Sequence, residues 1–142
     1  MKRFHLFFAF VLLFSFFAMH STVFAQEEPV MYFCEKYGTY GEQGVSDRFT
    51  TGYLTVMVRS NRALGLYDVS IQLDKYNFRT GEFNYYKKFD YSLDPESNYV
   101  FFAKNDDSDM EFEDPGFYRV FLLDDRDRTV ASAIIEIIRD RE

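Results

Sequence analysis

Short runs in which apolar and polar residues alternate dominate the chain from residue 30 onward. The clearest lies in Leu66–Tyr76, where Val69, Ile71 and Leu73 share one face and polar residues occupy the other. A period of two with this contrast predicts a β-strand with one buried and one solvated face. Similar runs of β-branched and aromatic residues, separated by Gly, Asn, Asp or Pro, follow along the chain. The pattern therefore predicts an all-β domain of about seven strands.

The expected strands are Val30–Tyr37, Thr51–Arg59, Leu66–Tyr76, Glu82–Tyr91, Asn98–Lys104, a short Met110–Phe112, and a terminal hairpin of Phe117–Leu123 and Thr129–Arg139. Between the first two, the glycine-bearing segment Gly38–Arg48 is expected to be a loop. In Glu82–Tyr91 the alternation predicts Phe83, Tyr85 and Phe89 on one face. The apolar content of Ala131–Ile138 would also fit a helix, but its isoleucines are β-branched, which favours a strand.

The first 25 residues have the pattern of an export signal. Lys2 and Arg3 precede the apolar run Leu6–Ala18, and Val23 and Ala25 place small side chains where a signal peptidase requires them. The apolar run is shorter than the roughly 20 residues that span a bilayer. We expect a signal peptide over 1–25, cleavage after Ala25, and a mature domain over 26–142 that is periplasmic or extracellular. An uncleaved membrane anchor is the alternative.

The mature chain lacks the residues that most enzymes use. His5 and His20 both lie in the predicted signal, tryptophan is absent, and Cys34 is the single cysteine. A general base for nucleophilic catalysis is therefore hard to find, and we expect no enzyme activity and no cofactor. Loss of Lys2 and Arg3 shifts the net charge from −7 to −9. Such a chain repels nucleic acid and anionic lipid, so neither is expected as a partner.

A single cysteine in the mature chain excludes an intramolecular disulfide. Two interpretations fit Cys34: a small buried apolar side chain, or a thiol that is reactive or paired with another chain. A small exported domain without disulfides depends on its packed core for stability.

Two acidic segments could in principle carry chemistry. Asn105–Asp109 has oxygen ligands at alternate positions, but an EF-hand would need Gly and Glu where this chain has Met110 and Gly116. A solvated acidic turn is the expectation there, with a calcium site of another type as the alternative. Asp124–Arg128 mixes charges at a hairpin tip and is expected to be solvated. Nothing fixes a carboxylate pair at the separation that glycoside hydrolysis requires, so no metal or catalytic residue is predicted.

One segment resembles a known architecture. Asp114-Pro115-Gly116-Phe117-Tyr118-Arg119-Val120 resembles the start of strand F in immunoglobulin-like domains, where a tyrosine hydroxyl bonds back to upstream backbone. Tyr118 matches that tyrosine, and Val120 stands where antibody domains have a cysteine. Without a disulfide pair or tryptophan, the chain is more similar to the immunoglobulin-like or fibronectin-like sandwiches of bacterial exported proteins. The resemblance implies an antiparallel β-sandwich of adhesive, spacer or accessory function, with Tyr118 structural.

The terminal hairpin offers a candidate interaction surface. If Tyr118, Val120 and Leu122 point inward, alternation places an apolar set on the outer face: Phe121, Leu123, Ile134 and Ile138. A covering segment of the chain, a protein partner or a second copy could bury these side chains. We therefore expect a non-catalytic binding or structural module that acts through protein–protein contacts. The abundance of tyrosine supports a second hypothesis, a small-ligand or carbohydrate-binding accessory domain with stacked aromatic rings.

Overall fold

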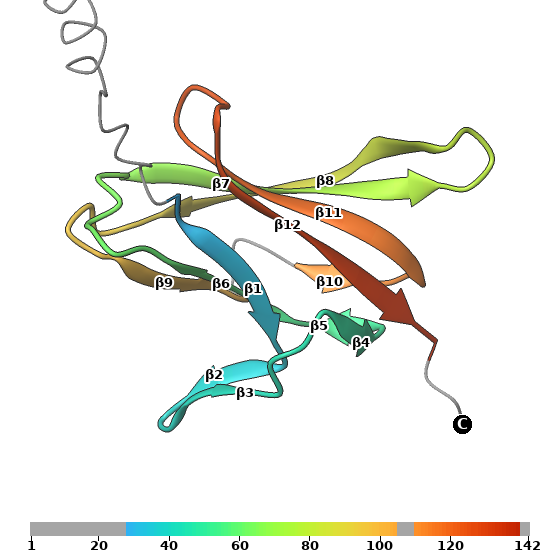
Figure 1. Cartoon of the computed structure of the whole chain (residues 1–142), viewed down its shortest axis with the longest axis horizontal. Helices are drawn as coiled ribbons and strands as arrows, with labels where there is room; N and C mark the ends of the chain where they lie inside the picture. Colours follow the sequence, from blue (N-terminus) through green and yellow to red (C-terminus); the bar gives the residue numbers. More distant parts are fainter. Residues whose placement is uncertain (1–27, 105–109, 140–142) are drawn as a thin grey trace, which may run out of the picture.

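The computed structural model describes residues 28–104 and 110–139 (Figure 1). Every regular element in these two ranges is a β-strand. In chain order the strands are β1 (Val30–Cys34), β2 (Lys36–Gly38), β3 (Gly41–Gln43), β4 (Arg48–Thr50), β5 (Gly52–Tyr53), β6 (Thr55–Arg59), β7 (Asp68–Asn77), β8 (Glu82–Ser92), β9 (Tyr99–Phe102), β10 (Glu111–Phe112), β11 (Gly116–Leu123) and β12 (Thr129–Ile138). The prediction of an all-β fold is confirmed.

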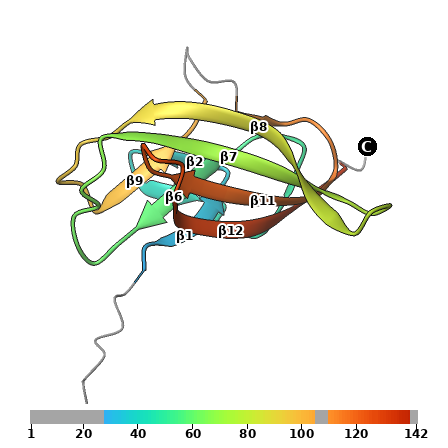
Figure 2. The same cartoon turned by 90° about the horizontal axis from the view of Figure 1, so that it is seen from above.

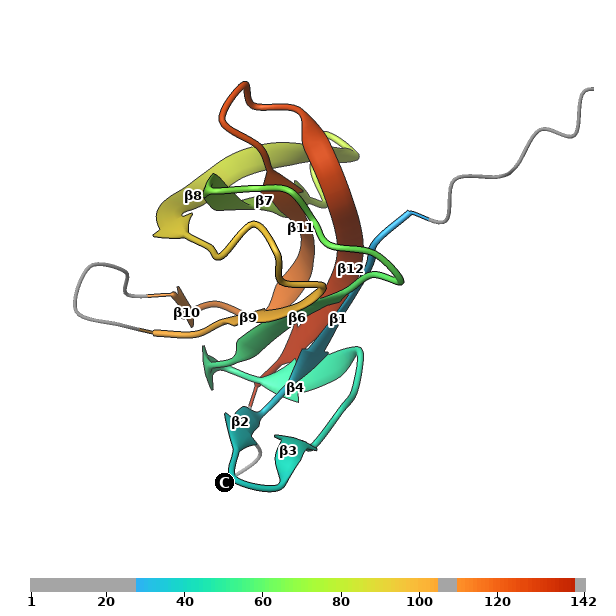
Figure 3. The ribbon, with the colours of Figure 1, turned by 90° about the vertical axis from the view of Figure 1, so that its left-hand side faces the viewer.

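The strands form two main layers. A five-stranded sheet has the order β4-β12-β11-β7-β8, and a three-stranded sheet has the order β1-β6-β9. Figures 2 and 3 show the larger sheet curving over the smaller one. All main-sheet pairings are antiparallel except β12 with β4, which is parallel and spans only Glu136–Ile138 of β12. Two short pairs, β2–β3 and β5–β10, complete the described structure.

The core lies between the two sheets. Val69, Ile71 and Leu73 of β7 are buried there, as their alternation predicts. From the smaller sheet, alternate side chains of β6 and β9 meet them, among them Val56 and Phe102. Two stacked layers of alternating side chains exclude water from one face of each sheet, which is the arrangement of a β-sandwich.

Two expectations about local structure are wrong. The segment Gly38–Arg48 is not a loop, because it contains β3 and reaches the start of β4. In β8 the register shifts opposite Leu73 and Asp74, so Phe83 and Tyr85 pair with outward residues of β7, whereas Phe89 pairs with inward Ile71. A bulge of this kind interrupts the period of two, which the sequence pattern alone does not reveal.

The predicted signal peptide and the acidic segment Asn105–Asp109 lie outside the described residues. Within the described residues, no helix is long and apolar enough to cross a membrane.

Candidate functional site

The outer face of the five-stranded sheet carries exposed apolar side chains. Phe78, at the β7–β8 turn, is 71% exposed, and Ile134 of β12 is 55% exposed. Phe117 of β11 and Ile138 of β12 are also exposed, and the rings of Phe78 and Phe117 lie 6.1 Å apart. We call Phe78, Phe117, Ile134 and Ile138 the outer patch. None of the described segments covers it.

The terminal-hairpin residues predicted to bind a partner have different surroundings. Ile134 and Ile138 are exposed, and Phe121 is half-buried. Leu123 is a correction, because it is buried with only 6% of its surface exposed. The β11–β12 register shifts between Leu122 and Leu123, so the alternation that predicted an exposed Leu123 ends one residue before it.

An arginine between two rings explains why Phe121 is not fully exposed. The Arg119 guanidinium lies 4.8 Å from the ring centroids of both Phe83 and Phe121. It also donates to the buried carboxylate of Asp74 at 3.2 Å. This arrangement combines cation–π contacts with a partly buried ion pair and holds the middle of the outer face in one geometry.

Tyr118 lies in the core and not on a surface. Its side chain is fully buried, and its hydroxyl donates to the backbone carbonyl of Asp114 at 2.7 Å. The rings of Tyr86 and Phe112 pack edge-on against it. Burial raises the pKa of Tyr118 to about 12, because the charged phenolate would be desolvated there. The geometry that the resemblance implies for this tyrosine is therefore present.

The outer face of the three-stranded sheet is covered in part by the chain itself, although Phe101 stays 50% exposed. The β2–β3 hairpin lies on the side of this sheet away from the larger one (Figure 1). Tyr37 of the hairpin stacks on Phe101 of β9 with centroids 4.6 Å apart. Beneath this cover Met57 and Cys34 have no exposed surface. Outer-facing residues of the small sheet therefore form a second, minor core.

A carboxylate with two tyrosine partners holds the hairpin in place. Glu42 of β3 accepts a hydrogen bond from the Tyr32 hydroxyl and interacts with the Tyr99 hydroxyl. These hydrogen bonds lower the pKa of Glu42 below its ordinary value. Burial and the same carboxylate raise the pKa of Tyr99 and of Tyr32. Cys34 beneath the hairpin also has a raised pKa, because burial disfavours the thiolate. The buried-thiol interpretation therefore fits the structure better than a reactive thiol.

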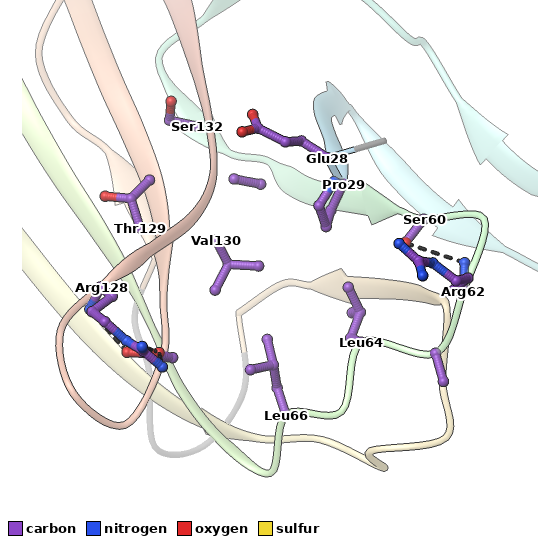
Figure 4. Close-up of a pocket in the computed structure, with 13 residues that line it drawn as sticks. Glu28, Pro29, Ser60, Arg62, Leu64, Leu66, Arg128, Thr129, Val130 and Ser132 are labelled. Carbon is purple, nitrogen blue, oxygen red and sulfur yellow. Dashed lines mark hydrogen bonds and ion pairs between the residues drawn. The ribbon is translucent and has the colours of Figure 1, made fainter. Parts of the chain in front are cut away.

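A groove of about 830 Å³ opens between the sheets at the start of β12. In Figure 4 the side chains of Leu64, Leu66 and Val130 point toward a common space, with Pro29 opposite. All three side chains are half-buried and pack against the core. The groove therefore has an apolar floor that continues into the interior.

Charged residues stand at the rim of the same groove. Asp124 is buried and accepts hydrogen bonds from the backbone N–H groups of Arg126 and Arg128, each at 2.9 Å. The Arg128 side chain adds an ion pair, and these interactions lower the pKa of Asp124. Asp124 thus caps the β11–β12 turn, and its carboxylate oxygens are already used by hydrogen bonds and an ion pair within the turn. Glu28 and Arg62 complete the rim and are exposed.

The described residues contain no cluster of three or more metal-ligating side chains. The calcium alternative concerns Asn105–Asp109, which lie outside those residues. The rings at the outer patch do not form a flat platform: the exposed Phe78 ring is tilted 56° to Phe117 and stands at 90° to Tyr76. Within residues 28–104 and 110–139 one ring pair is stacked nearly parallel, Tyr37 and Phe101, and the two rings cover each other's facing surfaces.

The sequence pattern misses Phe78 and the groove. Phe78 lies in a turn segment, where periodicity has no meaning, although a large apolar residue in a turn is itself an unusual signal. The groove is made by three segments distant in sequence. No model of a known protein family matches the sequence, and no curated protein does so either.

Proposed function

We propose that this chain is an exported, non-catalytic binding or structural module that acts through protein–protein contacts on the outer patch. The observation that carries the proposal is the difference between the two outer faces. The small sheet has its own hairpin as a partial cover, with Tyr37 stacked on the half-exposed Phe101, whereas Phe78, Phe117, Ile134 and Ile138 have no described segment over them. Apolar side chains gathered on one face mark interaction sites more often than scattered ones do.

We propose further that the sandwich is immunoglobulin-like. Three features support this: the antiparallel β7–β11–β12 succession, the parallel pairing of β4 with the last strand, and the hydroxyl of Tyr118 bonded to Asp114. An immunoglobulin-like module would present its sheet faces and strand edges for binding, although a fold of this kind hosts many functions.

Export is the cellular part of the proposal. It rests on the pattern of the first 25 residues: a basic start, a short apolar run, and small side chains at Val23 and Ala25. N-terminal sequencing of protein recovered outside the cytoplasm should begin at Gln26. An intact Met1 in the localised protein would contradict cleavage.

The outer patch is tested by charge substitution. Phe117→Lys with Ile138→Lys should abolish capture of a native partner from the exported fraction of the source cell. Both positions are exposed on the sheet surface, so the fold should be retained. Tyr40→Lys, at a hairpin tip that is 92% exposed, is the matched control and should leave capture unchanged. Equal capture by the double variant would reject the patch as the contact surface.

The carbohydrate hypothesis has weaker support in this structure. Sugar binding by stacking requires open ring faces, and the exposed rings of the outer patch pack at steep angles to one another. A glycan array separates the two functions, because a hit that the double variant retains would favour carbohydrate over the proposed protein contact.

A further inference from the structure

The five-stranded sheet has an open edge along the first part of β12. β11 pairs with β12 along one side, from Thr129 to Ile137. On the other side β4 pairs only with Glu136–Ile138. Over Thr129–Ile135 the second side of β12 has no hydrogen-bonded strand partner among the described residues, although β1 lies close to β12 (Figure 3). An edge of this kind presents backbone donors and acceptors that another chain can pair with.

The direction of the free backbone groups follows from one hydrogen bond. The Glu136 N–H donates to the Asp47 carbonyl at 2.8 Å, away from β11. Successive residues of a strand direct their backbone groups to opposite sides, so Ser132 and Ile134 direct theirs to the same side as Glu136. Beyond the reach of β4, these groups face the open edge.

The β12 edge also lacks the usual protection against pairing. Its open stretch, Thr129–Ile135, contains no charged residue. At the opposite edge of the sheet, β8 carries Lys87 and Lys88 and has a bulge. Charges and bulges on an edge strand prevent pairing with other chains. Of the two edges, the open stretch of β12 is the one without these protective features.

The groove described above runs beside this edge. Thr129, Val130, Ala131 and Ser132 form one of its walls, and Leu64 and Leu66 lie across from them. Its volume of about 830 Å³ exceeds that of a single side chain and falls in the usual range of binding pockets. An added strand would find hydrogen-bond partners on the edge and an apolar floor next to it.

We propose that an extended segment of a partner protein adds to the β12 edge as a further strand and seats an apolar side chain between Leu64, Leu66 and Val130. Strand addition of this kind takes affinity from backbone hydrogen bonds and specificity from side-chain pockets. The site shares only Ile134 with the outer patch, and uses its backbone and not its side chain. It goes beyond the proposed contact face, so each can fail without the other.

A second copy of this chain fits the edge less well. Two β12 edges could pair, but the inward side chains of β12, Ala131 and Ile135, are already buried in their own core. They could not enter the groove of the other copy, which would stay empty. The side chains of a segment from another protein are not already buried in a core. Such a segment fills the groove with whichever apolar side chain its sequence places there.

The rim defines the chemistry of the segment. Glu28 and Arg62 are exposed at the groove and have no ion pair among the described residues. Charge complementarity therefore favours a segment with an apolar centre and one basic and one acidic residue near it.

The experiment uses a phage-displayed library of random ten-residue peptides, panned on the mature protein. Enriched peptides are synthesised and their affinities measured for wild type, Ser132→Pro and Ser132→Ala. Proline removes the edge-facing N–H without breaking a bond inside the sheet, whereas alanine keeps it. We expect binding to wild type and to Ser132→Ala, and at least about tenfold weaker binding to Ser132→Pro, because the ring also obstructs the new ladder.

Two further measurements test the proposal independently of the Ser132→Pro variant. Peptides are also N-methylated at odd or at even backbone positions. Only one of these two sets should bind more weakly, because only alternate N–H groups of an added strand face β12. This measurement needs no protein variant, so it tests the proposal even if Ser132→Pro does not fold. Leu66→Lys should weaken peptides that carry an apolar centre. The proposal is overturned if no peptide is enriched, if Ser132→Pro binds as well as wild type, or if N-methylation has no parity. It is also overturned if sedimentation shows a wild-type dimer that Ser132→Pro dissociates, since a second copy then occupies the edge.

Discussion

The two outer faces of the sandwich are both built from alternating strands, but they differ in how far another segment of the chain covers them. On the small sheet, Met57 and Cys34 face outward and have no exposed surface, because the β2–β3 hairpin folds over them. On the large sheet, Ile134 and Phe117 face outward and stay exposed. Alternation thus decides which way a side chain points, but a separate segment decides whether it meets water.

The largest expected effect comes from opening the covered face. Met57→Ala should lower the free energy of unfolding by about 2–5 kcal/mol, because it leaves a cavity under the hairpin. Ile134→Ala on the uncovered face should change it by less than about 0.5 kcal/mol. Urea denaturation of both variants measures the difference. Similar losses at both positions would mean that the two faces are equally buried in solution.

Tyr118 provides the next largest effect, from the core between the two faces. Tyr118→Phe removes the hydroxyl that satisfies the Asp114 carbonyl and should cost about 1–3 kcal/mol. The same change at Tyr40, which is 92% exposed, should cost almost nothing. Equal denaturation midpoints for wild type and Tyr118→Phe would contradict a structural role for this hydrogen bond.

A smaller effect is expected from loosening the cover without removing it. Tyr32→Phe deletes one hydrogen bond to Glu42 and should cost about 0.5–1.5 kcal/mol. Hydrogen exchange should accelerate in residues 36–43, because local opening of the hairpin becomes easier. Tyr67→Phe, at an exposed position away from the hairpin, is the control. Uniform acceleration throughout the sandwich would show that the hairpin is not an independent unit.

The smallest effect concerns the pH dependence of the same cover. The lowered pKa of Glu42 means that its stabilising contribution is present above the ordinary value of 4.5 and is lost as the pH falls through the lowered one. The raised pKa of Tyr99 has the opposite sign, so its contribution is present below 10.0 and is lost in stronger alkali. Exchange in residues 36–43 should therefore show less protection at both extremes. In Glu42→Gln the acid limb should disappear.

Particular residues show how far the sequence carries the prediction. The inward Val69, Ile71 and Leu73 and the burial of Tyr118 follow from alternation and from one turn motif. Leu123 and Phe83 do not, because a register shift separates each of them from the rest of its strand, and a period of two cannot show such a shift. The sequence pattern does not predict the β2–β3 hairpin, because its strands are only three residues long and contain glycine. The groove depends on tertiary contacts between segments far apart in the chain.

Because Cys34 is buried, its reaction with a thiol reagent reports on opening of the folded domain. Cys34 is the single cysteine of the whole sequence and has no exposed surface in the folded domain. Any thiol reagent can therefore react at one place only, after the structure above that place has opened. The rate of modification would count opening events directly, without a label or a mutation. A protein so arranged also keeps its thiol from forming mixed disulfides for as long as it stays folded.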